Sequence, residues 1–128
     1  MADVIGGCPF CELNAADVIA ASEFAFAFRD RYPVAEYHTL VIPRRHVASL
    51  FELDAYELAD VWALVAEVRQ TLAEEFEIEA FNVGVNDGLP AGQTVLHAHV
   101  HVIPRAYGDS DDPRGGIRWV IPDKARYW

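Results

Sequence analysis

Three of the five histidines in this 128-residue chain stand at alternate positions, and they are His97, His99 and His101. Alternate side chains of a strand point to opposite faces, so a strand here would carry all three imidazoles on one face, about 7 Å apart. The opposite face would carry the apolar residues Leu96, Ala98, Val100 and Val102. Buried imidazoles each need hydrogen-bond partners, so three in this pattern indicate chemistry rather than packing.

Alternating imidazoles can act on phosphorus. A neutral imidazole is a nucleophile when its other nitrogen holds the proton and is oriented by an acceptor. Attack on phosphorus gives a phosphoramidate that water can cleave. The flanking imidazoles can donate hydrogen bonds to the phosphate oxygens or protonate the leaving group. In a second interpretation, the three histidines together ligate one metal ion of a metal-dependent enzyme.

The residues before the histidines extend the pattern, because residues 86–95 read Asn-Asp-Gly-Leu-Pro-Ala-Gly-Gln-Thr-Val. With the histidines, this run resembles the signature of the histidine-triad family, His-φ-His-φ-His-φ-φ, where φ is apolar. The resemblance covers the chain from Cys8 to Arg105. It implies the histidine-triad fold, commonly as a homodimer, and a hydrolase or transferase acting at the α-phosphate of a purine nucleotide. The substrate would be an adenosine phosphoramidate or a diadenosine polyphosphate. A nucleotide-binding module without turnover is a further alternative.

The resemblance also implies roles for single residues. His99 matches the nucleophile that carries the nucleotidyl group, and His101 matches the histidine that contacts phosphate. Asp30 matches the acid that binds the ribose hydroxyls, although a plain aspartate at a strand end would look the same. Asn86 matches an asparagine of the nucleotide-binding branch. His38, on a strand expected beside the site, is counted with the catalytic histidines.

The loop before the histidines is expected to bind phosphate. Gly92, Gln93 and Thr94 would line the phosphate site through backbone N–H groups and side chains. Gly92 is equally compatible with a simple turn.

Cys8 and Cys11 are the only cysteines, and their Cys-x-x-Cys spacing is the usual first half of a zinc clip. A tetrahedral site needs two more ligands, and His46 and His97 are the histidines left unassigned. Some bacterial members of the family resemble this chain at all four positions and carry a zinc there. We therefore expect a structural zinc and no organic cofactor. The alternative leaves the thiols unligated, with His97 supporting His99 by a hydrogen bond.

The formal net charge of −10 disfavours nucleic acid as a partner, because phosphate backbones select clustered Lys and Arg. Residues 52–79 hold nine acids and one base, whereas residues 105–128 hold five bases. The acidic block is predicted to be a solvated helix face, and a small phosphorylated ligand remains compatible. No apolar run approaches the ~20 residues of a membrane span, and residues 1–11 lack the features of a secretory signal. We expect a cytoplasmic protein that does not bind membranes.

The other elements must position these side chains within a single domain, residues 1–128. Alternation predicts strands at 24–28, 38–42, 81–86 and 96–104. The first two should pair antiparallel and bring Asp30 and His38 near one end of the sheet.

A helix is predicted over residues 54–76, where Asp54 and Glu57 form a capping box. Its apolar stripe would contain Leu58, Val61, Trp62, Val65, Val68, Leu72 and Phe76. The order of elements predicts an α+β domain with a mainly antiparallel sheet and one long helix packed on it. Residues 106–128 are expected to be an irregular segment.

Overall fold

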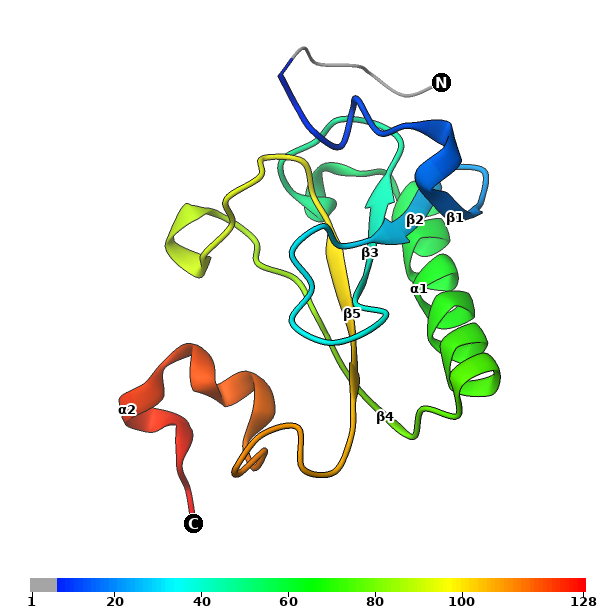
Figure 1. Ribbon diagram of the computed structural model, residues 1–128. Coiled ribbons are helices and arrows are strands. Elements are labelled where there is room, and N and C mark those ends of the chain that lie inside the picture. Colours follow the sequence, from blue (N-terminus) through cyan, green and yellow to red (C-terminus); the bar gives the residue numbers. More distant parts are fainter. Residues whose placement is uncertain (1–6) are drawn as a thin grey trace.

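A computed structural model describes residues 7–128 as one five-stranded sheet with a long helix on one face (Figure 1). The strands are β1 (Val18–Ala21), β2 (Ala25–Arg29), β3 (Thr39–Pro43), β4 (Ala80–Gly84) and β5 (Val100–Arg105). Their order is β1-β2-β3-β5-β4, and every neighbouring pair is antiparallel. The predicted α+β class is confirmed. Residues 1–6, part of the segment in which no secretory signal is expected, lie outside the described residues.

The long helix is α1, which spans Ala55–Phe76. The short helices are η1 (Ala15–Asp17), η2 (Leu50–Glu52), η3 (Leu89–Ala91), η4 (Gly116–Val120) and α2 (Pro122–Ala125). Within residues 7–128, none of these helices combines the length and hydropathy that crossing a bilayer requires.

The α1 helix begins where the capping box predicted. Asp54 accepts a hydrogen bond from the Glu57 N–H, and Glu57 accepts one from the Asp54 N–H. The predicted stripe is wrong at Trp62, which is 42% exposed, and it omitted Leu64, which is 1% exposed. A helix turns about 100° per residue, so Leu64 falls beside Val61 on the buried face while Trp62 is rotated away from it.

The two sides of the sheet differ in side-chain size. Ala25 and Ala27 of β2 face α1, and their small side chains let the helix approach the sheet. Phe28 faces the other way and packs with Leu40 and Ile42 of β3. This second face has no long helix over it among the described residues, and it is where the candidate site lies.

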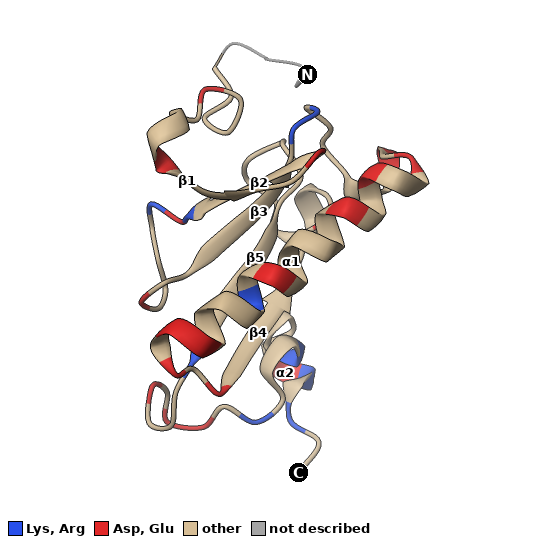
Figure 2. Ribbon diagram, turned by 90° about the vertical axis from the view of Figure 1, so that its right-hand side faces the viewer, with Lys and Arg blue, Asp and Glu red and all other residues tan. Residues whose placement is uncertain are grey.

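Figure 2 marks the acids along α1, of which Glu67, Glu74 and Glu75 are exposed and two others are not. Glu57 is buried and pairs with Arg45 at 2.9 Å. The half-buried Asp60 accepts hydrogen bonds from the Ser22 hydroxyl at 2.6 Å and the Phe24 N–H at 2.9 Å. The prediction of a wholly solvated acidic face is therefore wrong at these two positions, where the carboxylates fix neighbouring loops.

The histidine stretch is a strand only in its second half, because β5 begins at Val100. The Ala98 N–H donates to the Val47 carbonyl at 2.7 Å, so a contact with a distant loop replaces strand pairing there. Leu96 is 49% exposed, and its predicted place on the core face is wrong. His97 and His99 thus lie on the bent approach to β5, and only His101 lies within it.

The C-terminal segment is less irregular than predicted, since it contains η4 and α2. It turns back after β5 and runs beside β4, where Ile117 lies next to Gly84 (Figure 1). Arg105 holds the start of this reversal by bonding both carboxylate oxygens of Asp109 at 2.8 Å.

Candidate active site and metal centre

His38 and His101 form a hydrogen-bonded chain on the open face of the sheet. The Val34 N–H donates to His38 Nδ1 at 3.2 Å, so the proton of neutral His38 is on Nε2. His38 Nε2 then donates to His101 Nδ1 at 2.9 Å. This places the remaining proton of His101 on Nε2, which becomes a hydrogen-bond donor.

His99 carries its proton on the other ring nitrogen from His38 and His101. Its Nδ1 lies 2.8 Å from the His97 carbonyl oxygen, which can only accept, so Nδ1 holds the proton. The lone pair of His99 is therefore on Nε2. The side chain is 8% exposed, and its ring centroid lies 5.1 Å from that of His101. This is the protonation state that a nucleophilic imidazole needs.

Burial keeps the donor histidines neutral. It lowers the pKa of His38, and it lowers the pKa of His101 to about 4, with repulsion from His99 and His38 adding to the effect. The Asp30 carboxylate, 3.5 Å from His38 Nε2, acts in the opposite direction on both groups. Near pH 7 both imidazoles are therefore neutral.

His99 and His101 line a cavity of about 400 Å³. Four other residues singled out in the sequence also line it: Asp30, Asn86, Gly92 and Thr94. Its apolar wall is formed by Pro9, Phe10, Leu13, Phe28, Leu40 and Val95. An apolar wall with histidines and amides at one side suits a ligand that has an aromatic part and an anionic part.

Asp30 has features both of a plain strand-end aspartate and of a residue that binds a ligand. It directly follows β2 and lies beside the start of β3, as predicted, and its Oδ1 accepts a hydrogen bond from the Tyr32 N–H at 2.8 Å. The carboxylate also faces the cavity and lies near His38.

Gln93 contributes to the loop rather than to the cavity wall. Its side chain is 3% exposed; it accepts from the Gly88 N–H at 2.8 Å and donates to the carbonyls of Ala48 and Val95. Gly92 has φ of +97°, a conformation that favours glycine. Gln93 thus fixes the loop that presents its neighbours.

A second cluster joins Cys8, Cys11, His46 and His97, whose ligand atoms all lie within 4.8 Å of one another. His97 Nδ1 lies 3.6 Å from Cys8 Sγ and 3.5 Å from Cys11 Sγ, and His46 Nδ1 lies 3.2 Å from Cys11 Sγ. Tetrahedral zinc bonds of about 2.3 Å to sulfur and about 2.0 Å to nitrogen put such atoms roughly 3.5 Å apart. The spacing of these donors fits one zinc ion.

A hydrogen bond at the other ring nitrogen of His97 orients this side chain toward the thiols. His97 Nε2 donates to the Pro43 carbonyl at 2.8 Å, which leaves the Nδ1 lone pair toward the thiols. A second hydrogen bond of this kind orients metal-ligating histidines. Burial lowers the pKa of His97, which also favours the neutral imidazole that a metal requires.

The three alternating histidines do not converge on one point. Among residues 7–128, the groups able to hold a metal place His97 with the thiols, and His101 with His38 and Asp30. No such group in this part of the chain unites His97, His99 and His101. The interpretation that they ligate one metal together has no support in this geometry.

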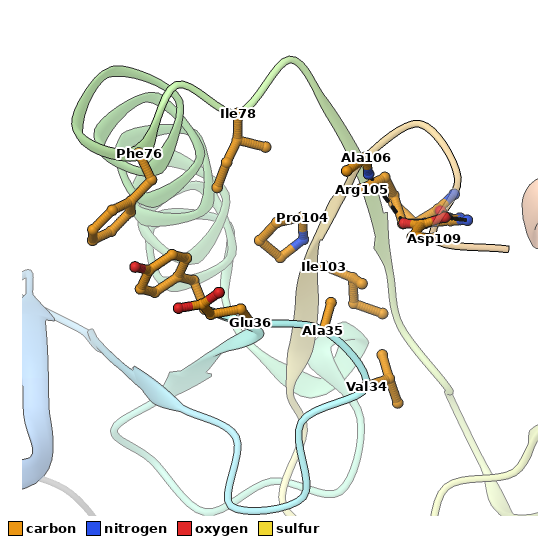
Figure 3. A pocket seen from close by; sticks show the side chains of 12 residues that line it. Val34, Ala35, Glu36, Phe76, Ile78, Ile103, Pro104, Arg105, Ala106 and Asp109 are labelled. Carbon is orange, nitrogen blue, oxygen red and sulfur yellow. Dashed lines mark hydrogen bonds and ion pairs between the residues drawn. The ribbon is translucent and has the colours of Figure 1, made fainter.

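Two larger cavities lie nearby. The larger, about 600 Å³, contains no histidine or cysteine; Figure 3 shows it between Phe76 and Ile78 after α1 and the paired Arg105 and Asp109. The other, about 440 Å³, lies under the C-terminal segment and shares His101 and Asn86 with the cavity of His99. The histidine site is therefore open on two sides.

Sequence reasoning missed two kinds of site residue. The Val34 N–H has no signal in the sequence, because any residue except proline supplies one. Phe10 does have a signal, since it lies between the two predicted ligands in Cys-Pro-Phe-Cys. Its ring centroid lies 5.1 Å from that of His99 and 5.3 Å from that of Phe28.

The sequence matches the HIT domain family over residues 12–108, and the chain belongs to this family. A relative from Schizosaccharomyces pombe, named bis(5'-nucleosyl)-tetraphosphatase [asymmetrical], is 41% identical over 92 residues. The match covers 72% of this chain and 50% of that relative, so the chain spans half of its length.

Solved structures show the same fold. A Plasmodium falciparum diadenosine triphosphate hydrolase superposes with a TM-score of 0.74 at 27% identity, covering 76% of this chain and 66% of that one. A zinc-bound histidine triad family protein from Mycobacterium smegmatis has a TM-score of 0.73 at 32% identity, covering 81% of this chain and 78% of that one. The resemblance seen in the sequence is confirmed.

Proposed function

We propose that this protein is an enzyme that hydrolyses or transfers a nucleotidyl group at the α-phosphate of a purine nucleotide, through a covalent intermediate on His99. The observation that carries the proposal is the 2.8 Å hydrogen bond from His99 Nδ1 to the His97 carbonyl, which leaves Nε2 as the nucleophilic lone pair. The relatives named as a tetraphosphatase and a diadenosine triphosphate hydrolase support hydrolysis of a phosphoanhydride bond. A diadenosine polyphosphate is therefore the first substrate to test, ahead of an adenosine phosphoramidate.

The reaction proceeds in two displacements at phosphorus. A bond forms between His99 Nε2 and the α-phosphorus while the bond from phosphorus to the leaving oxygen or nitrogen breaks. His101 Nε2–H, fixed by the chain from Val34 through His38, donates a hydrogen bond to a non-bridging oxygen and stabilises the charge that develops there. Water then attacks phosphorus and loses a proton to solvent, while the bond between phosphorus and His99 Nε2 breaks and its electron pair returns to Nε2.

The nucleoside occupies the cavity of about 400 Å³, with its base against the apolar wall. Asp30 accepts from the ribose hydroxyls, while Asn86, Gly92 and Thr94 surround the phosphate. The leaving half extends into the neighbouring cavity of about 440 Å³, whose lining includes Arg105, Ile117 and Trp119. His101 and Asn86 line both cavities and so stand beside the bond that breaks.

Cys8, Cys11, His46 and His97 are proposed to hold one structural zinc. The donor distances and the likeness to a zinc-bound Mycobacterium smegmatis protein support this assignment. Four protein ligands fill a tetrahedron, so the site supplies no open position for substrate. Elemental analysis of protein purified without chelators should give one zinc per chain; a value near zero with freely titratable thiols contradicts the proposal.

The covalent step has a direct test. Wild-type protein is mixed with diadenosine tetraphosphate, quenched in alkali, and examined by mass spectrometry for an adenylyl group on the peptide that carries His99. The adduct is expected in the wild type and absent from His99→Ala. A wild-type enzyme that turns substrate over without an adduct would exclude the covalent mechanism.

We also propose a homodimer, as the family resemblance implies. β4 lies at one edge of the sheet, and the adjacent segment exposes Ile117, Val120 and Ile121 by more than half of their surface. Sedimentation equilibrium should give twice the chain mass of 14.3 kDa. A mass near 14.3 kDa at micromolar concentration would contradict this proposal.

A further inference from the structure

One short segment of the chain serves two sites at once. Cys8 and Cys11 supply the thiols of the metal cluster, and Pro9 and Phe10 between them line the cavity beside His99. The Cys11 N–H donates to Cys8 Sγ at 3.4 Å, which closes the segment into a tight turn around its thiols. Fixing the thiols therefore fixes the cavity wall.

Phe10 is the point of contact between the sites. Its ring meets the His97 ring edge-on with centroids 5.9 Å apart, and meets the His99 ring in the same way at 5.1 Å. One aromatic ring thus touches a predicted metal ligand and the predicted nucleophile. The Phe28 ring of β2 packs edge-on against the Phe10 ring, with centroids 5.3 Å apart.

The backbone of this segment forms no regular element that would fix it to the sheet. Between Gly7 and Asn14 the chain contains turns and no strand or regular helix. Up to Leu13 the backbone hydrogen bonds described for these residues stay within the segment, from Glu12 to Cys8 and from Leu13 to Phe10, while the Asn14 carbonyl accepts from Asp17 of the adjacent η1. Its position on the sheet therefore depends on side chains, which are the thiols and the apolar contacts of Phe10 and Leu13.

We propose that zinc binding at the Cys8–Cys11 turn and nucleotide binding at the His99 cavity are thermodynamically linked, with Phe10 as the positioning residue that joins them. The inference rests on the proposed function, because the ligand of the cavity is taken to be a purine nucleotide. Zinc holds the turn in place, and the turn presents Phe10 to the base. By linkage, each ligand then raises the affinity of the other by the same factor, on the order of tenfold.

The binding experiment uses adenosine monophosphate and Zn²⁺ on the whole chain. Calorimetry measures the affinity for adenosine monophosphate in zinc-loaded and metal-free protein, and near-ultraviolet circular dichroism reports whether the metal-free chain is folded. We expect affinity to fall about tenfold when zinc is removed. Equal affinity in both folded forms would overturn the linkage.

A spectroscopic experiment keeps the site occupied by replacing zinc with Co²⁺. Co²⁺ in a tetrahedral site with two sulfur and two nitrogen ligands has visible absorption bands that depend on ligand geometry. Adenosine monophosphate should shift these bands in the wild type and should leave them unchanged in Phe10→Ala. A zinc that only stabilises the fold would give no shift in either protein, and this result would overturn the inference.

The variants separate positioning from general stability. Phe10→Ala should keep one zinc per chain while its affinity for adenosine monophosphate falls about tenfold. Phe26→Ala is the matched control, since Phe26 packs on the same apolar cluster but does not line the cavity. It should lower the melting temperature without changing nucleotide affinity. Equal effects of the two substitutions on affinity would contradict a specific role of Phe10.

Failure of the inference can be told from failure of the proposed function. An adenylyl adduct on His99, with nucleotide affinity indifferent to zinc and to Phe10→Ala, would keep the function and overturn the linkage. Absence of any nucleotide binding to zinc-loaded wild type would overturn both.

Discussion

The two histidine clusters meet at the stretch from His97 to His99, yet these two residues leave opposite ring nitrogens free of a proton. His97 donates from Nε2 to the Pro43 carbonyl, so its Nδ1 lone pair faces two thiols. His99 donates from Nδ1 to the His97 carbonyl, so its Nε2 lone pair faces the cavity. The residue type is the same, and the carbonyl that each ring meets decides whether it suits a metal or phosphorus.

The comparison also shows why the clusters stay distinct. Thiols surround one set of nitrogens, and sulfur is a ligand that zinc prefers. The other set meets imidazoles, the Asp30 carboxylate and the backbone groups of Val34 and His97, and its ring-to-ring hydrogen bond is already made. Metal binding and phosphate chemistry can therefore occur two residues apart without competing for the same atoms.

The strongest test of the division is His99→Ala. We expect turnover of diadenosine tetraphosphate to fall by about 10⁴-fold or more, since loss of the proposed nucleophile would remove the covalent route. Zinc content and the melting temperature should stay close to the wild-type values. Steady-state kinetics measure the turnover, and elemental analysis measures the zinc content. Substantial activity in the variant would show that the roles of the two clusters are misassigned.

The reciprocal substitution is His46→Gln, which removes a proposed zinc ligand that does not line the His99 cavity. Zinc content should fall from one per chain toward zero, and kcat should change little. The lost binding energy should cost about 3 kcal/mol of stability, or roughly 10 °C in melting temperature. Calorimetric melting provides the measurement. An unchanged melting temperature would mean that this cluster holds no structural metal.

Asp30→Ala tests whether Asp30, in the cavity of His99, binds the ribose of the nucleotide. Because a carboxylate accepts from both ribose hydroxyls, the variant should bind adenosine monophosphate roughly tenfold more weakly. Binding of the 2'-deoxy analogue should change less. Titration calorimetry with both ligands makes the comparison, and equal losses would assign Asp30 to orienting His38 instead.

The smallest expected effect is on pH dependence. The lowered pKa of His101, about 4, means that the unfolded chain takes up a proton near pH 6.5 that the folded chain refuses. Stability should therefore fall as pH drops from 6.5 toward 4, by about 1 kcal/mol between pH 7 and pH 5 after allowance for solvent screening. Above pH 6.5 this group contributes no change.

Two measurements check this prediction. Nuclear magnetic resonance should show the His101 ring titrating near pH 4. Urea unfolding should show a weaker pH dependence in His101→Asn than in the wild type. A titration midpoint near 6.5 would mean that His101 is charged at mildly acidic pH and that the donor chain does not hold it neutral.

Local patterns predicted the parts of the fold that depend on neighbouring residues. The alternation in 24–28 placed alanines and phenylalanines on opposite faces of β2, and Asp54 with Glu57 located the start of α1. The strand β1 was not predicted, because Val-Ile-Ala-Ala has no alternation of polar and apolar residues.

Contacts between distant residues were beyond such patterns. The bend at Ala98 depends on the Val47 carbonyl, and the tautomer of His38 depends on the Val34 N–H. The cluster of Cys8, Cys11, His46 and His97 was named from spacing and family resemblance, and the structure brings its four ligand atoms together. The dual position of Phe10 required the three-dimensional arrangement.

The wide separation of the proposed zinc ligands along the chain has a consequence for folding kinetics. Cys8 lies 89 positions before His97, and Cys11 lies 35 positions before His46. Closing such long loops is slow and entropically costly, so we expect these four side chains to meet only after β3 and β5 have paired. Zinc should then leave the refolding rate unchanged and slow unfolding, because it would bind only after the sheet has formed and so after the folding transition state.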